Sequence, residues 1–161
     1  MALPPLIGAL LDPARYPHRA APVAVAETHA SWVLLAGDYA YKIKKPVTLP
    51  FLDYGSVEKR RAACLEELRL NRRLAPDLYL DVVAIGGTPE APSLGGRGPA
   101  IEHAVRMLRF PEAARLDHVA ARGELTAEHL TGLARAVVRF HAAAAVAGTE
   151  SPFGAPQRVF A

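Results

Sequence analysis

Two segments of this chain carry lysines and glutamates that could form ion pairs with each other. The lysines lie in GDYAYKIKKP (residues 37–46) and the glutamates in the segment LEEL (residues 65–68). If residues 37–46 form a strand, Lys42 and Lys44 share a face with Ala40, and the aromatic and aliphatic side chains between them face the other way. One face therefore suits a core and the other an anion. The alternative is that the lysines only protect an edge strand against unwanted pairing.

The glutamates lie on a predicted helix that begins at Ser56 and ends before Pro76. Glu67 lies in a row with the apolar residues at i−4, i+3 and i+7, whereas Glu66 groups with basic side chains on a solvated face. A carboxylate on an apolar stripe needs a partner, because burying it unpaired is costly. We therefore expect Glu67 to pair with Lys42, and Glu66 is the alternative if the helix is rotated.

The remaining pattern predicts an α+β fold with a five-stranded antiparallel sheet and one covering helix, followed by trailing helices. A loop rich in proline and glycine separates the last two strands, and the last helix is capped by Thr126. On that last helix His141 shares a stripe with Leu130 and Leu133, which predicts a core histidine. The predicted strands cover residues 23–26, 32–36, 39–45, 78–87 and 99–110, and the last helix covers about 126–147.

The composition of the 161 residues excludes several classes of protein. Cys64 is the single cysteine, which excludes an internal disulfide or a cysteine zinc cluster and makes a cytoplasmic setting the default. The histidines show no ligand spacing, so we expect no metal site. The N-terminus fits a signal peptide poorly, and no apolar run is long enough for a membrane span. The net charge of +3 is dispersed and aromatic residues make up only 7%, which disfavours nucleic acid as a partner.

Four blocks of the sequence together resemble a known family. They are ETHASWVLLAGDYAYKIKKP, LEELRLNRRLAPDLYLDVV, AVRMLRFP and VVRFHAA. A strand that ends in a hydrophobic residue, any residue and lysine, as in YAYK (residues 39–42), followed by a helix with an inward glutamate and two more strands, resembles the N-terminal lobe of the protein-kinase-like fold. More closely, the blocks resemble the beginning of bacterial aminoglycoside phosphotransferase-like proteins. By this resemblance residues 1–110 form the N-terminal lobe and residues 111–161 begin a helical C-terminal lobe.

The resemblance implies roles for particular residues in binding ATP with Mg²⁺. Lys42 would contact the phosphates and Glu67 would hold it in place. Thr28 and His29, in the turn between the first two strands, would overlie the phosphates. The backbone of a hinge segment made of Met107, Leu108 and Arg109 would meet the adenine.

The resemblance also implies what this chain lacks. The family places a catalytic aspartate, a metal-binding asparagine and a second metal-binding aspartate after the helix that here ends near His141. Beyond His141 the sequence contains one acidic residue, Glu150, and no asparagine. We therefore expect the chain to stop before the catalytic loop, to be inactive alone and to bind nucleotide weakly or not at all. The complete protein would transfer phosphate from ATP to the hydroxyl of a small molecule.

Two alternatives belong to other classes. A non-catalytic kinase-like module would dock a protein partner or form an oligomer through the surface that the second lobe would otherwise cover. A basic nucleic-acid-binding domain would use Lys42, Lys44 and Lys45 with the helix arginines, and its affinity would fall steeply with salt.

Overall fold

The computed structural model describes residues 3–96 and 98–148. Its contacts divide the chain into two compact units, one that ends at His118 and one that begins at Val119. The first unit combines helices with antiparallel strands, so the predicted α+β class is confirmed. Its elements are α1 (Pro5–Ala9), a 3-10 turn (Pro13–Arg15), β1 (Val23–Glu27), β2 (Ser31–Ala36), β3 (Tyr39–Lys44), β4 (Thr48–Leu49), β5 (Leu52–Asp53), α2 (Val57–Asn71), β6 (Tyr79–Gly87), β7 (Pro92–Leu94), β8 (Glu102–Leu108), a 3-10 turn (Glu112–Ala114) and α3 (Leu116–Ala121), which crosses the division.

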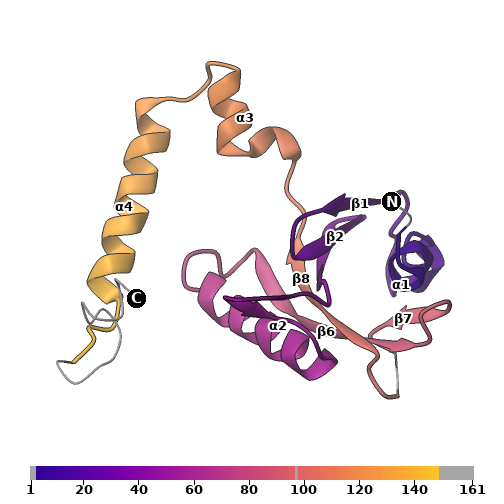
Figure 1. The fold of residues 1–161 in the computed structure, drawn as a ribbon. Helices are drawn as coiled ribbons and strands as arrows, with labels where there is room; N and C mark the ends of the chain where they lie inside the picture. Colours follow the sequence, from indigo (N-terminus) through magenta and orange to yellow (C-terminus); the bar gives the residue numbers. More distant parts are fainter. Residues whose placement is uncertain (1–2, 97, 149–161) are drawn as a thin grey trace. The chain divides into compact units, whose positions relative to one another are not determined.

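A six-stranded antiparallel sheet forms the centre of the first unit, in the order β1-β2-β3-β8-β6-β7 (Figure 1). The five predicted strands all occur, as β1, β2, β3, β6 and β8. The predicted count of five is wrong because β7 forms inside the expected loop and pairs with the end of β6. Gly87 turns the chain there with a φ of 86°. Pro92 is tolerated in β7 because an edge strand has one side without ladder bonds.

Strand β3 lies inside the sheet, between β2 and β8. Lys42 is directly opposite Val33 of β2 and Val105 of β8. The interpretation of these lysines as protection of an edge strand is therefore wrong. Side chains that are directly opposite in an antiparallel pair point to the same face, so the register places Lys42 among apolar neighbours.

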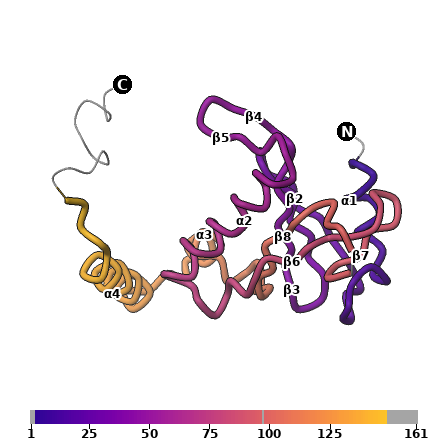
Figure 2. Tube along the Cα trace, turned by 90° about the horizontal axis from the view of Figure 1, so that it is seen from below, coloured from indigo at the N-terminus to yellow at the C-terminus, as the bar shows by residue number. Residues whose placement is uncertain are grey.

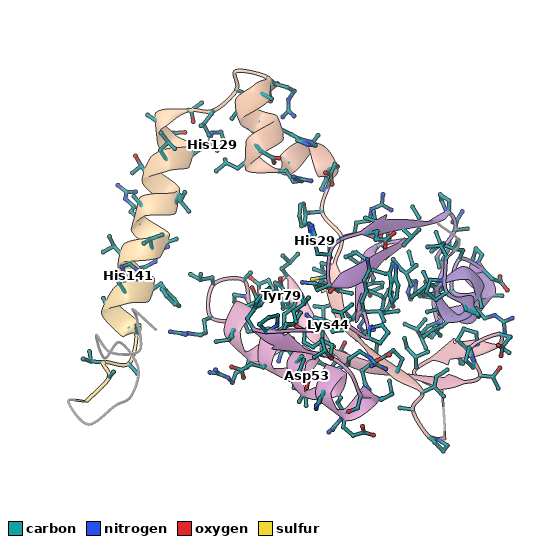
Figure 3. All side chains as sticks on the ribbon, in the orientation of Figure 1. His29, Lys44, Asp53, Tyr79, His129 and His141 are labelled. Atoms are coloured by element: carbon teal, nitrogen blue, oxygen red, sulfur yellow. The ribbon has the colours of Figure 1, made fainter. Side chains whose placement is uncertain are left out.

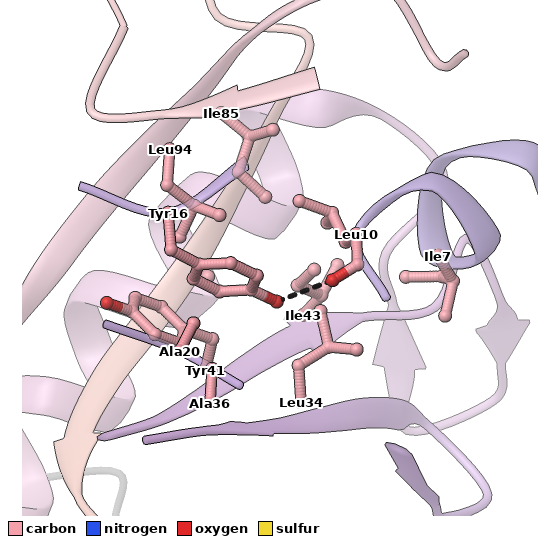
Figure 4. Packing of buried hydrophobic residues seen from close by; sticks show 11 residues of the cluster. Ile7, Leu10, Tyr16, Ala20, Leu34, Ala36, Tyr41, Ile43, Ile85 and Leu94 are labelled. Atoms are coloured by element: carbon pink, nitrogen blue, oxygen red, sulfur yellow. Dashed lines mark hydrogen bonds between the residues drawn. The ribbon is translucent and has the colours of Figure 1, made fainter. Parts of the chain in front are cut away.

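One face of the sheet is covered by the N-terminal segment (Figure 4). Tyr41 and Ile43 of β3 are buried there together with Ile7, Leu10 and Tyr16. The hydroxyl of Tyr16 donates to the carbonyl oxygen of Leu10 at 2.8 Å, which fixes the end of the α1 segment against the sheet. Full burial of such side chains stabilises the fold by about 1.5–3 kcal/mol each. This packing fixes β3 with its lysines on the opposite face.

Helix α2 covers the opposite face along β6 and β8 (Figure 1). Ser56 caps it by accepting a hydrogen bond from the amide of Lys59, as predicted. Arg60 and Cys64 are the buried residues of α2, and Arg60 Nε donates to Glu102 Oε2 of β8 at 2.7 Å. The β4–β5 hairpin, which the sequence did not indicate, precedes α2 and lies outside the main sheet (Figure 2).

The second unit contains helix α4 (Ala127–Ala143). Thr126 caps it by accepting from the amide of His129, whose ring in turn accepts from the amide of Thr126. Leu130 and Leu133 are each 52% exposed, and His141 is exposed as well. Within this unit no described element covers the stripe, so the prediction of a core histidine is not confirmed. No described helix has the length and apolar character needed to cross a membrane.

Candidate functional site

Two lysines of β3 share one carboxylate of α2. Lys42 Nζ donates to Glu67 Oε1 at 2.8 Å, and Lys44 Nζ donates to Glu67 Oε2. The predicted pairing of Lys42 with Glu67 is confirmed, and the alternative of Glu66 is wrong because Glu66 pairs with Arg69 on the exposed side of the helix. Lys44 was not expected in the pair, although strand alternation places it on the same face as Lys42.

The three charged side chains differ in their exposure. The exposed fraction is 29% for the side chain of Lys42, 11% for Glu67 and 5% for Lys44. Burial works to raise the pKa of Glu67, but the hydrogen bonds and charges of Lys42 and Lys44 outweigh it and hold the pKa below its usual value. Burial works to lower the pKa of Lys44, but Glu67 outweighs it and raises that pKa. The pKa shifts of Glu67 and Lys44 both favour the charged form, and by formal charge two lysines against one glutamate leave one positive charge.

This cluster lies in a pocket of about 420 Å³, which we call the lysine pocket. Tyr54 and Tyr79 contribute aromatic rings to its wall, and Asn71 contributes an amide. Figure 3 shows Lys44 and Tyr79 near each other on the face of the sheet that α2 covers. The complete lining is Lys42, Lys44, Tyr54, Ala63, Glu66, Glu67, Leu70, Asn71 and Tyr79.

A second pocket, of about 410 Å³, is mainly apolar, and we call it the apolar pocket. Arg109, Glu112 and Arg115 are its charged members. Residues of four strands and of the segment after β8 line it. The sequence does not indicate this pocket, because its lining residues are far apart along the chain. The complete lining is Ala26, Val33, Leu35, Ala40, Leu78, Met107, Leu108, Arg109, Phe110, Glu112 and Arg115.

The two pockets are neighbours on one face of the sheet. Ala40 of the apolar pocket precedes Lys42 by two residues on β3, a distance of about 7 Å along a strand. Val33 of the apolar pocket lies directly opposite Lys42. The apolar pocket lies beside the ammonium group of Lys42, an arrangement that suits a ligand with an apolar part and an anionic part.

The predicted hinge residues Met107, Leu108 and Arg109 all line the apolar pocket. The amides of Leu108 and Arg109 already donate to backbone carbonyls, at 2.9 and 2.8 Å. They are therefore not available to a bound base. The amide of Phe110, which lines the same pocket, has no hydrogen-bond partner within the described ranges, so it is the donor that a ligand could use.

The predicted phosphate-covering residues Thr28 and His29 lie in the turn between β1 and β2. Figure 3 labels His29. Thr28 Oγ1 donates to the carbonyl oxygen of Ser31 and accepts from the amide of Ser31, so this hydroxyl stabilises the turn itself. His29 is exposed. The structure brings neither residue into the two pockets, and their role in covering phosphates stays a prediction.

Lys42 and Lys44 of β3, and Lys45 directly after it, do not form a free basic surface. Lys42 and Lys44 pair with Glu67, and Lys45 Nζ donates to Glu27 Oε1 at 2.5 Å. Among residues 3–96 and 98–148, no three His, Cys, Asp or Glu side chains gather as a metal site would require.

Comparison with known proteins gives relatives without a described activity. Uncharacterized protein Rv2004c of Mycobacterium tuberculosis and Uncharacterized protein Mb2027c of Mycobacterium bovis are each 36% identical to this chain over 119 residues. The match covers 74% of this chain and 22% of each relative, so the chain spans about a fifth of the length of these relatives. No family model matches the chain, and no solved structure matches it.

Proposed function

We propose that this chain is the nucleotide-binding lobe of an ATP-dependent small-molecule phosphotransferase, similar to the aminoglycoside phosphotransferase-like family. The observation that carries the proposal is the ion pair of Lys42 and Glu67 next to an apolar pocket on the same face of the sheet. The order of three strands, a helix with an inward glutamate and two long strands agrees with the resemblance.

In this proposal each pocket takes one part of ATP. The apolar pocket takes the adenine between the strand side chains, with the amide of Phe110 as a hydrogen-bond donor. Lys42 is more exposed than Lys44 and takes phosphate oxygens, while Glu67 holds its ammonium group in position. The single excess positive charge of the cluster favours an anionic ligand.

The chain binds the nucleotide in this proposal and does not transfer the phosphate. Transfer depends on metal ions that neutralise charge and on a group that positions the acceptor hydroxyl. The sequence after His141 offers no aspartate or asparagine for either task. The magnesium ligands and the acceptor site then belong to further parts of a longer protein, as the 22% coverage of the mycobacterial relatives allows.

Calorimetry with ATP tests this function on the full chain. Wild-type protein is expected in this proposal to bind ATP weakly, and Lys42→Met is expected to lose a charge-assisted hydrogen bond of about 1.5–3 kcal/mol. That loss corresponds to a rise in Kd of about 10- to 150-fold. Lys59→Met removes the same charge from an exposed lysine and is expected to leave the affinity unchanged. Absence of binding by the wild type, or equal weakening by both variants, would argue against the proposal.

A second candidate function rests on α4. Its exposed apolar stripe, which includes Leu130, Leu133 and Val137, is suited to a protein interface. In this alternative the chain is a non-catalytic module that assembles with a second copy. Sedimentation would then show a dimer that Leu133→Glu dissociates, whereas a monomer at all accessible concentrations would exclude the alternative.

A further inference from the structure

We propose that the lysine pocket is a second binding site, separate from the nucleotide site, and that it takes a small aromatic carboxylate. The inference goes beyond the proposed function, in which the nucleotide meets Lys42 and the apolar pocket while Lys44 has no role of its own. It starts from the hydrogen-bond donors of Lys44 and from the side chains that surround them in the lysine pocket.

Lys44 carries a buried ammonium group with more donors than acceptors. An ammonium group has three N–H donors. Among residues 3–96 and 98–148, the one hydrogen-bond acceptor of Lys44 Nζ is Glu67 Oε2. The centre of the Tyr54 ring lies 5.4 Å from Nζ and attracts the cation, but a ring face is a poor substitute for an oxygen acceptor. The side chain is 5% exposed, and a buried donor without an acceptor is costly. An anionic oxygen in the pocket would satisfy these donors.

The walls of the lysine pocket suit an aromatic ring attached to that oxygen. Tyr54 and Tyr79 supply ring faces, and Ala63 and Leu70 supply apolar carbon, in a pocket of about 420 Å³. Aromatic rings attract one another in offset or edge-to-face arrangements. Figure 3 shows Tyr79 close to Lys44, so one ligand can reach the ring and the ammonium group together.

Tyr79 also offers a donor to a carboxylate. Its backbone carbonyl accepts from Arg72 Nε at 2.8 Å, whereas its hydroxyl forms no hydrogen bond in the parts of the chain that the structure describes. Burial, together with the charge of Glu67, raises the pKa of Tyr79, so the hydroxyl keeps its proton and can donate it. A carboxylate has two oxygens, one for this hydroxyl and one for Lys44.

The charges that line the pocket favour a ligand with one negative charge. Lys42 and Lys44 against Glu67 leave one positive formal charge. Glu66 also lines the pocket, but Arg69 pairs with it on the exposed side of α2. A single carboxylate would therefore neutralise the cluster without bringing an excess of negative charge into a partly buried site.

Position along β3 separates this site from the nucleotide site. Ala40 lines the apolar pocket and Lys44 lines the lysine pocket, about 13 Å further along the strand, with Lys42 between them. Two anions on either side of Lys42 repel each other, so each is expected to weaken the binding of the other by less than about tenfold and not to exclude it.

Titration of the full chain with benzoate, followed by amide chemical shifts, tests the second site. The wild type is expected to bind benzoate saturably with a Kd of about 1 mM or lower, and the largest shifts should lie in α2 and β6. Lys44→Met is expected to raise this Kd by about tenfold or more, because it removes a charged donor. Lys59→Met removes an exposed lysine that pairs with Asp53 and is expected to keep the wild-type Kd. Benzyl alcohol, which lacks the charge, is expected not to bind.

Two further measurements keep the test decisive even if Lys44→Met does not fold. Leu70 is 42% exposed, so Leu70→Trp fills the pocket from its rim without changing the charged cluster, and it is expected to abolish benzoate binding. Saturating ATP is expected to leave benzoate bound. Absence of saturable binding by the wild type, an unchanged Kd in Leu70→Trp, or complete displacement of benzoate by ATP would overturn the second site. Acetate binding as tight as that of benzoate would overturn its aromatic specificity. The benzoate titration needs no nucleotide, so a failure of ATP binding would count against the proposed function alone.

Discussion

The buried ion pair of Arg60 and Glu102 anchors α2 to β8, and its removal is predicted to destabilise the fold by several kcal/mol. Arg60 Nε donates to Glu102 Oε2 at 2.7 Å, and Arg60 Nη1 donates to the carbonyl oxygen of Tyr54 at 2.8 Å. The side chains of Arg60 and Glu102 are 9% and 7% exposed. Arg60→Met would leave Glu102 buried with the amide of His103 as its remaining donor. Loss of one partner of such a pair costs about 3–5 kcal/mol.

The destabilisation caused by Arg60→Met is also predicted to depend on pH. Burial raises the pKa of Glu102 despite the opposing effects of the His103 amide and Arg60. The folded protein therefore holds this proton to higher pH than the unfolded chain, and stability falls as pH rises through that interval. Without Arg60 the pKa of Glu102 in the folded protein rises further, so this pH interval extends to higher pH. The destabilisation by Arg60→Met is thus expected to be smaller at about pH 5 than at about pH 8, because Glu102 can be protonated at the lower pH.

Urea unfolding at the two pH values measures these free energies. Arg69→Met is the matched control, since Arg69 is on the same helix but pairs with Glu66 at the surface, and it is expected to change the stability much less than Arg60→Met. The double variant Arg60→Met/Glu102→Gln is expected to recover part of the stability, because no buried charge remains. A cost of Arg60→Met no larger than that of Arg69→Met, or a cost that grows as the pH falls, would refute the reasoning.

Three further predictions concern single side chains. Tyr16→Phe removes the buried hydrogen bond to Leu10 and is expected to cost about 0.5–1.5 kcal/mol in urea unfolding; no measurable cost would mean that this bond does not fix the N-terminal segment. Glu67 has a lowered pKa, so its contribution to stability is present above the unfolded pKa and is lost as pH falls through the folded pKa. Glu67→Gln should therefore make the free energy of unfolding depend less steeply on pH below about 4.5. An unchanged slope would contradict the ion-pair cluster. Burial raises the pKa of Cys64 to about 11, so a thiol reagent is expected to modify it only after denaturation, and rapid modification of the folded protein would contradict its burial.

The sequence identified the centre of the site because both of its elements carry regular periodicities. Alternation in β3 placed Lys42 opposite the core face, and the helical row of α2 placed Glu67 inward. It indicated Lys42 alone and missed Lys44, because the two share a face and only the position of α2 along β3 decides which ammonium group reaches the carboxylate. In the structure both do.

Other features depend on contacts between distant residues that no local pattern reveals. Arg60 and Glu102 are 42 positions apart, and neither sequence neighbourhood indicates a buried charge. The N-terminal segment covers one face of the sheet through Ile7, Leu10 and Tyr16, although it shows no extended periodicity of its own. The proline and glycine content after β6 indicated only a loop, but β7 forms there because an edge position tolerates Pro92.

The central claim, that Lys42 faces the phosphates of a nucleotide, is tested most directly by an affinity label. An adenosine that carries an electrophilic sulfonyl fluoride in place of the phosphates would react with the lysine it meets, and peptide mapping by mass spectrometry would identify that lysine. The account predicts an adduct on Lys42, prevented by ATP, and no adduct on the buried Lys44. An adduct on Lys44, equal labelling of exposed lysines such as Lys59, or labelling that ATP does not prevent would contradict it.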